Sequence, residues 1–297
     1  MLVISRILCP VDRSDIAKRA LRYAFRLARQ HHARLRVLHV VEPGVIVGDS
    51  EGASAGVPAD VLSAAEEDIG WLVASVVDTE VEMDTVVRDG PVARTILREA
   101  RDYGASLIVV GTHGRGGFER LALGSVTEKL LRKASCPVLV VPPGDTADMP
   151  ISTQRVVCPT DFSAPATAAL DYARVAATAT GAALSIVTVV EWPFGETTGD
   201  DAVAALRRSL EAEATSKLQA AIVEGGPPTD TAVLYGKPRK EIVAFARAQR
   251  AGLIVMGVAG RGALDLAVLG STTHHVVREA PCPVLVVPDR ATAEKRS

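Results

Sequence analysis

The chain of 297 residues is short of aromatic side chains, of long apolar runs and of surplus positive charge, and each shortage excludes a class of function. Phe, Trp and Tyr make up 4% of the residues, too few for a platform on which single-stranded nucleic acid stacks. Lys and Arg number 33 against 35 Asp and Glu, so no basic excess attracts nucleic acid or an anionic membrane. No apolar run approaches the roughly 20 residues that span a bilayer. We therefore expect no nucleic-acid partner and no membrane association.

Cysteine is also scarce, and its positions follow one pattern. Each cysteine stands directly before a proline, and no CxxC pair occurs; the four are Cys9, Cys136, Cys158 and Cys282. Isolated thiols at strand-like positions are typical of buried apolar residues, not of a disulfide framework or a metal site. The first ten residues lack the basic start and cleavage site of a secretory signal. These features predict a cytoplasmic protein without a metal site.

The chain contains an internal duplication. The sequence RILCPVDRS at residues 6–14 returns as RVVCPTDFS at 155–163. Residues 105–142 align without a gap with residues 251–288 and share 21 identities in 38 positions. A period of about 150 residues indicates that a complete domain was duplicated, unlike the short repeats of a solenoid. The predicted organisation is a first domain over 1–142, a linker over 143–153 that is rich in Pro, Gly, Thr and Asp, a second domain over 154–288 and a polar tail over 289–297.

Within each copy, short β-branched runs alternate with longer segments that have apolar residues at helical spacing. Runs such as LIVVG and LIVMG are apolar at successive positions, as expected for strands covered by helices on both faces. The fold class is therefore α/β, with two tandem copies of a five-stranded parallel-sheet α/β/α sandwich. The predicted strands are 6–10, 34–41, 80–88, 106–111 and 138–141 in the first copy, and 155–159, 183–190, 231–235, 253–257 and 284–287 in the second.

A glycine pattern follows the fourth strand of each copy, at the edge where open parallel sheets bind ligands. The spacing is Gly-x2-Gly-x9-Gly-Ser, formed by Gly111, Gly114, Gly124 and Ser125 and again by Gly257, Gly260, Gly270 and Ser271. Glycine lets the backbone approach a ligand closely, and a helix N-terminus behind such a loop binds anions. Arg115 and Arg261 follow the second glycine and would add positive charge. Because the spacing occurs twice, we favour phosphate binding over glycines that merely shape tight turns.

The start of the next helix carries a second prediction. Ser125 and Ser271 are predicted to be N-caps, and Ser125 to Glu128 fits a capping box.

Both copies resemble universal stress protein domains. The glycine spacing matches the nucleotide motif of that family, and the segments CPVDRS, CPTDFS and the two CPVLVVP endings resemble its first and last strands. The resemblance implies a Rossmann-like fold of the adenine-nucleotide α-hydrolase type. It also implies, through the ATP-binding branch of the family, that the chain binds ATP or another adenine nucleotide, with or without Mg²⁺.

The resemblance further implies which residues contact the nucleotide. An aspartate after the first strand can accept hydrogen bonds from ribose hydroxyls or the adenine amine, and an apolar residue near the end of the second strand lines the adenine pocket. The implied residues are Pro10, Asp12, Val40, Val110, Gly111, Gly114, Gly124, Ser125 and Val126, and in the second copy Pro159, Asp161, Val189, Met256, Gly257, Gly260, Gly270, Ser271 and Thr272. The alternative for Asp12 is a turn or N-cap residue. Ser14 and Ser163 are available as caps, which weakens that alternative.

No catalytic residue is predicted. The first turn lacks GxGxxG, no GK[ST] follows a glycine run, and neither an SGGxDS loop nor an HxGH element is present. The six histidines are scattered, without the i, i+4 spacing of HExxH. The sequence favours a nucleotide-binding regulatory module of the stress response. The alternatives are an ATP-using enzyme with slow hydrolysis and a nucleotide-free scaffold.

The two copies differ at the glycine loop, where His113 and Thr112 of the first copy align with Ala259 and Val258 of the second. This difference predicts unequal nucleotide affinity. Members of the family pair through their final strand, an edge that exposes unpaired backbone groups. The resemblance therefore implies an internal pseudo-dimer of the two copies, with a homodimer and an unidentified regulatory protein partner as further associations.

Overall fold

The computed structural model describes residues 4–42, 57–76, 81–113, 123–143, 155–191, 201–260 and 269–288, with side chains from residue 204 onward in the segment that starts at 201. The chain divides into two compact units. The N-terminal unit comprises Val3–Pro143 and the C-terminal unit comprises Gly144–Thr292. Among the described residues, no helix is long and apolar enough to cross a membrane.

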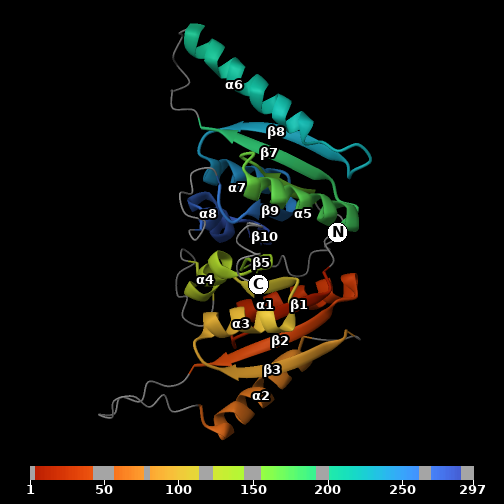
Figure 1. The fold of residues 1–297 in the computed structure, drawn as a ribbon, viewed down its shortest axis with the longest axis vertical. Coiled ribbons are helices and arrows are strands. Elements are labelled where there is room, and N and C mark those ends of the chain that lie inside the picture. Colours follow the sequence, from red (N-terminus) through yellow and green to blue (C-terminus); the bar gives the residue numbers. More distant parts are fainter. Residues whose placement is uncertain are drawn as a thin grey trace, which may run out of the picture. The chain divides into compact units, whose positions relative to one another are not determined.

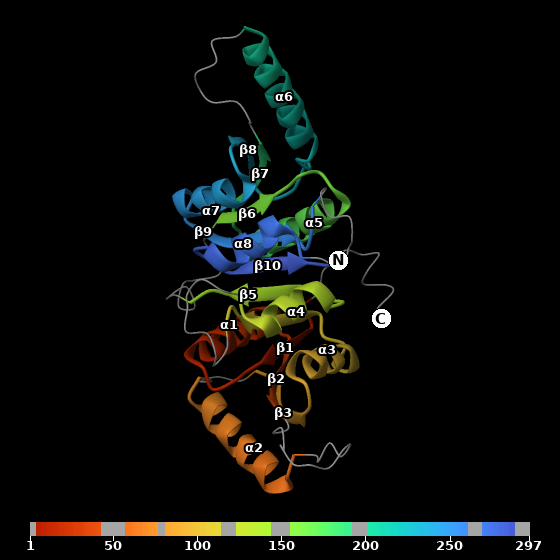
Figure 2. The same ribbon diagram turned by 90° about the vertical axis from the view of Figure 1, so that its left-hand side faces the viewer.

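The N-terminal unit alternates strands and helices along the chain (Figure 1). Its strands lie in the order β3-β2-β1-β4-β5, and the described pairs are parallel. Helices α1 and α2 pack on one face of the sheet and α3 and α4 on the other, and Figure 2 shows α1 and α3 on opposite sides of the strands. The elements are β1 (Arg6–Pro10), α1 (Asp15–His31), β2 (Arg34–Val41), α2 (Ala59–Ala74), β3 (Met83–Asp89), α3 (Val92–Tyr103), β4 (Leu107–Gly111), α4 (Ser125–Lys133) and β5 (Val138–Val141).

The C-terminal unit repeats this arrangement. Its strand order is β10-β9-β6-β7-β8, with α5 and α6 against one face and α7 and α8 against the other. The elements are β6 (Arg155–Pro159), α5 (Ala164–Thr180), β7 (Leu184–Val190), α6 (Asp201–Ala220), β8 (Thr229–Tyr235), α7 (Pro238–Ala248), β9 (Ala251–Gly257), α8 (Ser271–Glu279) and β10 (Val284–Val287). The predicted fold class is confirmed in both units.

The central strands are buried along their whole length, as their continuous apolar sequences predict. All five residues of β4 and all four of β5 are buried. The edge strand β3 reads MDTVVRD and is exposed at four of its seven positions. Charged side chains on an edge strand discourage pairing with other chains. Strand β3 begins at Met83, whereas residue 80, the predicted start, lies outside the described residues.

Helix α1 shows how local sequence sets the boundaries of an element. Ser14 has extended backbone angles, and its side chain accepts a hydrogen bond from Ala17 N, which satisfies one of the first free N–H groups of the helix. The last helical residue is His31, and the C-cap His32 adopts the left-handed conformation at φ 50°. Ser163 caps α5 in the same way, by accepting from Ala166 N. The two serines that the sequence made available as caps, Ser14 and Ser163, do cap these helices.

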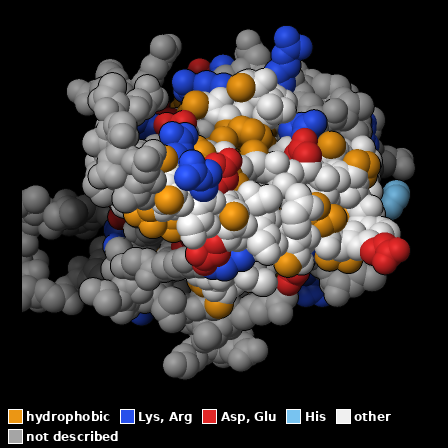
Figure 3. Space-filling model, turned by 90° about the horizontal axis from the view of Figure 1, so that it is seen from above, with side chains coloured by type: hydrophobic (Ala, Val, Ile, Leu, Met, Phe, Trp, Pro, Cys, Tyr) orange, Lys and Arg blue, Asp and Glu red, His pale blue; other side chains and the backbone are white. Residues whose placement is uncertain are grey.

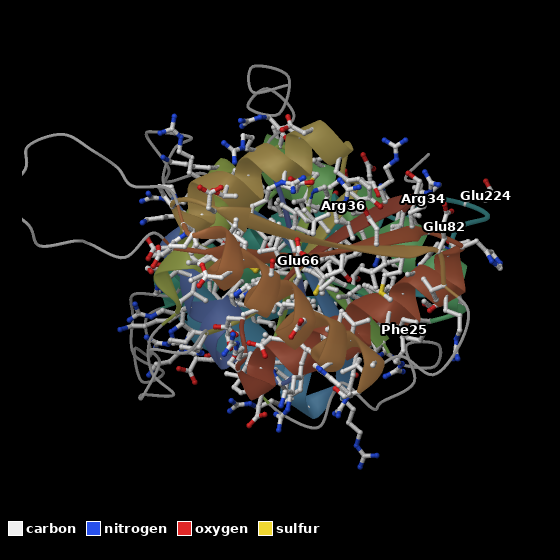
Figure 4. All side chains as sticks on the ribbon, turned by 90° about the horizontal axis from the view of Figure 1, so that it is seen from below. Phe25, Arg34, Arg36, Glu66, Glu82 and Glu224 are labelled. Atoms are coloured by element: carbon white, nitrogen blue, oxygen red, sulfur yellow. The ribbon has the colours of Figure 1, made fainter. Side chains whose placement is uncertain are left out.

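The two units differ in a charged cluster between β2, β3 and α3. The Glu99 side chain is 8% exposed and accepts from Arg36 Nη1 at 2.8 Å and from Arg88 Nε at 3.2 Å. Figure 4 shows Arg36 near a second pair, Arg34 and Glu82. The equivalent positions in the C-terminal unit hold Ser185, Leu234 and Phe245. In that unit Ser185 Oγ accepts from Arg155 Nη1 at 2.8 Å, and the ion pairs of Glu99 have no counterpart at these positions.

Candidate functional site

The predicted site lies at the topological switch point of each sheet. From β1 the chain builds the sheet outward through β2 to β3, and β4 is then added on the other side of β1. The same change of direction occurs between β6 and β9 in the C-terminal unit. The loops at the carboxyl ends of two such strands diverge to opposite faces and leave a crevice, where open α/β sheets bind ligands. The two sequence features singled out above, the aspartate and the glycine motif, follow these two strands.

The aspartates after the first strand have the same local geometry in both units. Asp12 Oδ1 accepts from Ser14 N at 3.0 Å and from Ser14 Oγ at 2.5 Å. Asp161 Oδ1 accepts from Ser163 N at 3.0 Å and from Ser163 Oγ at 2.6 Å. Each aspartate is half-buried, and it is the following serine that caps the helix. The turn thus fixes the direction of the carboxylate at the sheet edge.

In the C-terminal unit the aspartate meets the glycine motif. A Cβ atom added to Gly260 would lie 2.5 Å from Asp161 Oδ2, closer than such contacts occur in proteins. Only a residue without a side chain therefore allows the carboxylate and the loop backbone to approach this closely. The structure brings together two residues that are 99 positions apart in the sequence and that were predicted to share one site.

The first glycine of each motif has a packing role. A Cβ atom on Gly111 would lie 2.3 Å from Ile16 Cγ2, and one on Gly257 would lie 2.9 Å from the backbone of Pro165. These glycines let the start of α1 or α5 lie directly against the end of the fourth strand. Both are buried, so they shape the crevice from beneath.

The prediction that Ser125 and Ser271 are N-caps is wrong. The N-caps are Gly124 and Gly270, and the serines are the first residues of α4 and α8. Glycine provides the extended N-cap conformation but has no side chain to accept a hydrogen bond, so the predicted capping box does not form. Among the described residues, no side chain caps either helix. The first N–H groups of both helices are therefore available to an anion.

A pair of threonines that sequence reasoning missed joins this helix to the strand. Thr127 Oγ1 donates to Gly111 O at 2.9 Å, and Thr273 Oγ1 donates to Gly257 O at 3.0 Å. Both threonines are buried. They hold the helix N-terminus against the carboxyl end of β4 or β9. The signal was present in the sequence, since both occur three residues after the last glycine of the motif.

The remaining predicted residues surround this core of the site. Pro10 and Pro159 are the buried last residues of β1 and β6, while Val110 and Met256 are buried one residue before the end of β4 and β9. Val40 and Val189 are half-buried near the ends of β2 and β7. The helix starts are more open: Ser125 and Ser271 are exposed, and Val126 and Thr272 half-buried. Gly114, Arg115 and Arg261 lie outside the described residues.

The two units differ in the position before the second glycine of the motif. Burial lowers the pKa of His113 below its ordinary value, whereas the equivalent Ala259 has no group that titrates. His113 Nδ1 lies 3.0 Å from Thr112 Oγ1. The equivalent of Thr112 is the buried Val258. The polar character of the N-terminal loop is therefore absent from the C-terminal one.

The cysteines and acidic residues indicate no other chemistry in the described part of the chain. All four thiols are free, and burial raises the pKa of Cys136, Cys158 and Cys282 to about 12. No cluster of His, Cys, Asp and Glu among the described residues has a metal-binding arrangement. On the face shown in Figure 3, Lys and Arg side chains are interspersed with Asp and Glu.

Comparisons with known proteins agree with this architecture. The model of the universal stress protein family matches residues 4–142 and 152–288. A universal stress protein of Mycolicibacterium smegmatis is 30% identical over 300 residues, which cover 96% of this chain and 97% of the relative. Universal stress protein YxiE of Bacillus subtilis is 30% identical over 147 residues, 47% of this chain and 99% of that protein.

A solved structure shows the same fold over nearly the whole chain. It is a universal stress protein from Archaeoglobus fulgidus, with a TM-score of 0.67 at 23% identity, and the match covers 97% of this chain and 98% of that one.

Proposed function

Since the chain belongs to the universal stress protein family, we propose that it binds ATP or a closely related adenine nucleotide and acts as a nucleotide-dependent regulatory module of the stress response. The observation that carries the proposal is the close approach of Asp161 Oδ2 to Gly260, beside a helix N-terminus that no described side chain caps. A carboxylate, a glycine backbone and free N–H groups at one sheet edge suit a ligand with both hydroxyl and phosphate groups.

Each part of the site has a defined task in this proposal. The N–H groups at the start of α4 and α8 bind phosphate oxygens, because the helix dipole places partial positive charge there. Asp12 and Asp161 accept hydrogen bonds from the ribose hydroxyls or the adenine amine. The apolar side chains Val40 and Val189 line the pocket for the base.

A divalent cation would reach this site together with the nucleotide. Mg²⁺ binds through phosphate oxygens and one or two carboxylates and needs no dedicated protein cage. The half-buried Asp12 and Asp161 would supply that carboxylate. When bound, the ion would neutralise phosphate charge.

The proposal includes no catalytic step. Thr112 Oγ1 lies 3.0 Å from His113 Nδ1, but this hydroxyl is buried, and no group among the described residues bonds Nε2 to orient the ring as a catalytic base requires. A regulatory module in the cytoplasm would pass the nucleotide state to a protein partner through the surface around the site.

The first test asks which ligand the protein holds. Mass spectrometry of material released from the purified, denatured chain should detect an adenine nucleotide at up to two per chain. Titration calorimetry of the nucleotide-free protein with ATP, ADP and GTP should give tighter binding for the adenine nucleotides. Binding of none of them would refute the proposal, and steady ATP turnover linked to an acceptor would favour the enzyme alternative.

A matched pair of variants tests the site itself. Asp161→Asn removes the charge of the carboxylate at Gly260 and should weaken binding at the C-terminal unit at least about tenfold, since hydrogen bonds to charged groups contribute ~1.5–3 kcal/mol. Asp230→Asn is the control, because Asp230 lies at the amino end of β8, the opposite edge of the sheet, and pairs with Arg155. If Asp161→Asn bound nucleotide at the C-terminal unit as tightly as Asp230→Asn does, the assignment of Asp161 to the site would be wrong.

A further inference from the structure

His113 has an unusual environment for a histidine at a strand end. Its Nε2 atom is buried and has no hydrogen-bond partner among the described residues. Its Nδ1 atom lies 3.0 Å from Thr112 Oγ1. A buried polar atom without a partner costs free energy, so such an atom in a folded protein calls for an explanation, for example a role in binding.

The surrounding backbone places residue 113 at the helix N-terminus. Gly124 N donates to Thr112 O at 2.9 Å, which joins the N-cap of α4 to the residue just before His113. In the C-terminal unit, a Cβ atom on Gly270 would lie 3.3 Å from the Cα atom of Ala259, the equivalent of His113. The backbone of residue 113 therefore lies beside the N-cap of the helix whose first N–H groups are assigned above to the phosphates.

The charge state of the His113 ring without a bound ligand follows from burial. Burial lowers the pKa of His113, so the ring is neutral at pH 7 when no ligand is bound. Several neighbouring groups already have partners: Ser14 donates to the Asp12 carboxylate, and His39 Nδ1 lies 2.8 Å from Val11 O. At this edge of the sheet, the adjacent elements carry titratable groups at Asp12 and Arg13 after β1, Asp15 and Lys18 in the first turn of α1, His39 near the end of β2, and Glu128, Lys129 and Arg132 in α4.

We propose that His113 takes up a proton from solvent when a nucleotide phosphate binds to the N-terminal unit, so that this site, unlike the C-terminal one, is regulated by pH. The inference rests on the function proposed above. In the protonated ring both nitrogens donate, Nδ1–H to Thr112 Oγ1 and Nε2–H to a phosphate oxygen. Ala259 cannot do this.

The expected pH dependence has a definite sign. A phosphate next to the imidazole favours the charged ring and so raises the pKa of His113 in the complex. Between the lowered pKa of His113 without a ligand and its raised pKa in the complex, binding takes up a proton. In that range the affinity of the N-terminal site increases as the pH falls, by at most about tenfold per pH unit. The affinity of the C-terminal site lacks this contribution.

The test measures protons directly. Calorimetric titration of the full chain with ADP, in two buffers with different ionisation enthalpies, gives the number of protons taken up per chain at each pH. The nucleotide phosphate titrates near pH 6 as well, but its contribution cancels in the comparison with His113→Ala. That variant should fold, since the duplicated unit has alanine at the same position.

We expect wild-type protein to take up more protons than His113→Ala, by a fraction of one proton per chain that peaks between pH 5.5 and 7.5, roughly the range in which histidine titrates. His113→Gln, which is polar but does not titrate, should behave like the alanine variant. Equal proton uptake in wild type and both variants, with binding intact, would overturn the inference and leave nucleotide binding standing. Absence of ADP and ATP binding by wild type would overturn both.

Discussion

Replacing Gly260 by alanine should weaken nucleotide binding in the C-terminal unit while leaving the fold intact. The added Cβ atom would lie 2.5 Å from Asp161 Oδ2 and 3.5 Å from Asp161 Cγ. The contact is with the end of a side chain, not with backbone, so the carboxylate turns aside. Asp161 Oδ1 is held by the N–H and hydroxyl of Ser163 at 3.0 and 2.6 Å, and turning strains these hydrogen bonds.

The magnitude follows from the hydrogen bond that is lost. If Asp161 no longer reaches the ligand, the loss is that of a hydrogen bond to a charged group, ~1.5–3 kcal/mol. One factor of ten in affinity corresponds to about 1.4 kcal/mol. Binding to the C-terminal unit should therefore weaken by roughly 10- to 100-fold. Gly260 is exposed, so the free energy of unfolding should change by less than about 1 kcal/mol.

Calorimetry resolves this effect, because the N-terminal site remains as an internal reference. The Gly260→Ala variant should keep one unchanged binding event per chain and show a weakened second one. Gly70→Ala is the matched control: a Cβ atom at Gly70, inside α2, meets nothing within 4 Å. That change should leave both affinities unaltered and stabilise the protein by roughly 0.5–1 kcal/mol. Unaltered affinity at both sites in Gly260→Ala would refute the role of the carboxylate.

Three further predictions concern stability and reactivity. Glu99→Ala removes the buried partner of Arg36, which keeps only Asp84 as an ion-pair partner among the described residues, and should destabilise the N-terminal unit by about 2 kcal/mol, the contribution of a hydrogen bond to a charged group. Faster hydrogen exchange in α3 than in the equivalent α7 would show this loss, and unchanged exchange would contradict it. Gly257→Ala places a Cβ atom 2.9 Å from the backbone of Pro165, which cannot move aside. The midpoint temperature of thermal unfolding should therefore fall by several degrees, and an unchanged midpoint would argue against this packing role. The four cysteines should react with a thiol reagent at pH 8 only after the protein is unfolded in urea, because burial raises the pKa of each thiol. Rapid reaction of the native protein would contradict this prediction.

Much of the fold was accessible from sequence because the signals are local and occur twice. The strands β1, β2, β5, β6 and β10 have the predicted boundaries. The starts of β8 and β9 are two residues earlier than predicted, at Thr229 and Ala251. Strand ends depend on hydrogen bonds to neighbouring strands, and hydrophobic patterning does not report these. The pairing of the two CPVLVVP segments stays a prediction.

The candidate site was predicted in part. The glycine spacing identified the residues at the sheet edge, but the serines of Gly124-Ser125 and Gly270-Ser271 were wrongly predicted as caps, because serine is a strong N-cap former and propensity favours it over glycine. The N-cap falls on the glycine since the buried Thr127 and Thr273 hydroxyls bond the ends of β4 and β9 and so set where the helix begins. That constraint is tertiary, and no helix-capping rule contains it.

The sequence by itself determined that the chain is a duplicated α/β domain of the universal stress protein family, because apolar periodicity, glycine spacing and the repeat are properties of residue order. The tertiary structure alone decided that Asp161 meets Gly260 and that the Nε2 atom of His113 is buried without a hydrogen-bond partner among the described residues. These facts depend on how strands distant in sequence pack side by side. The distance between Asp161 and Gly260 and the burial of the His113 nitrogen arise only when the sheet forms, and they determine how these groups can bind a ligand.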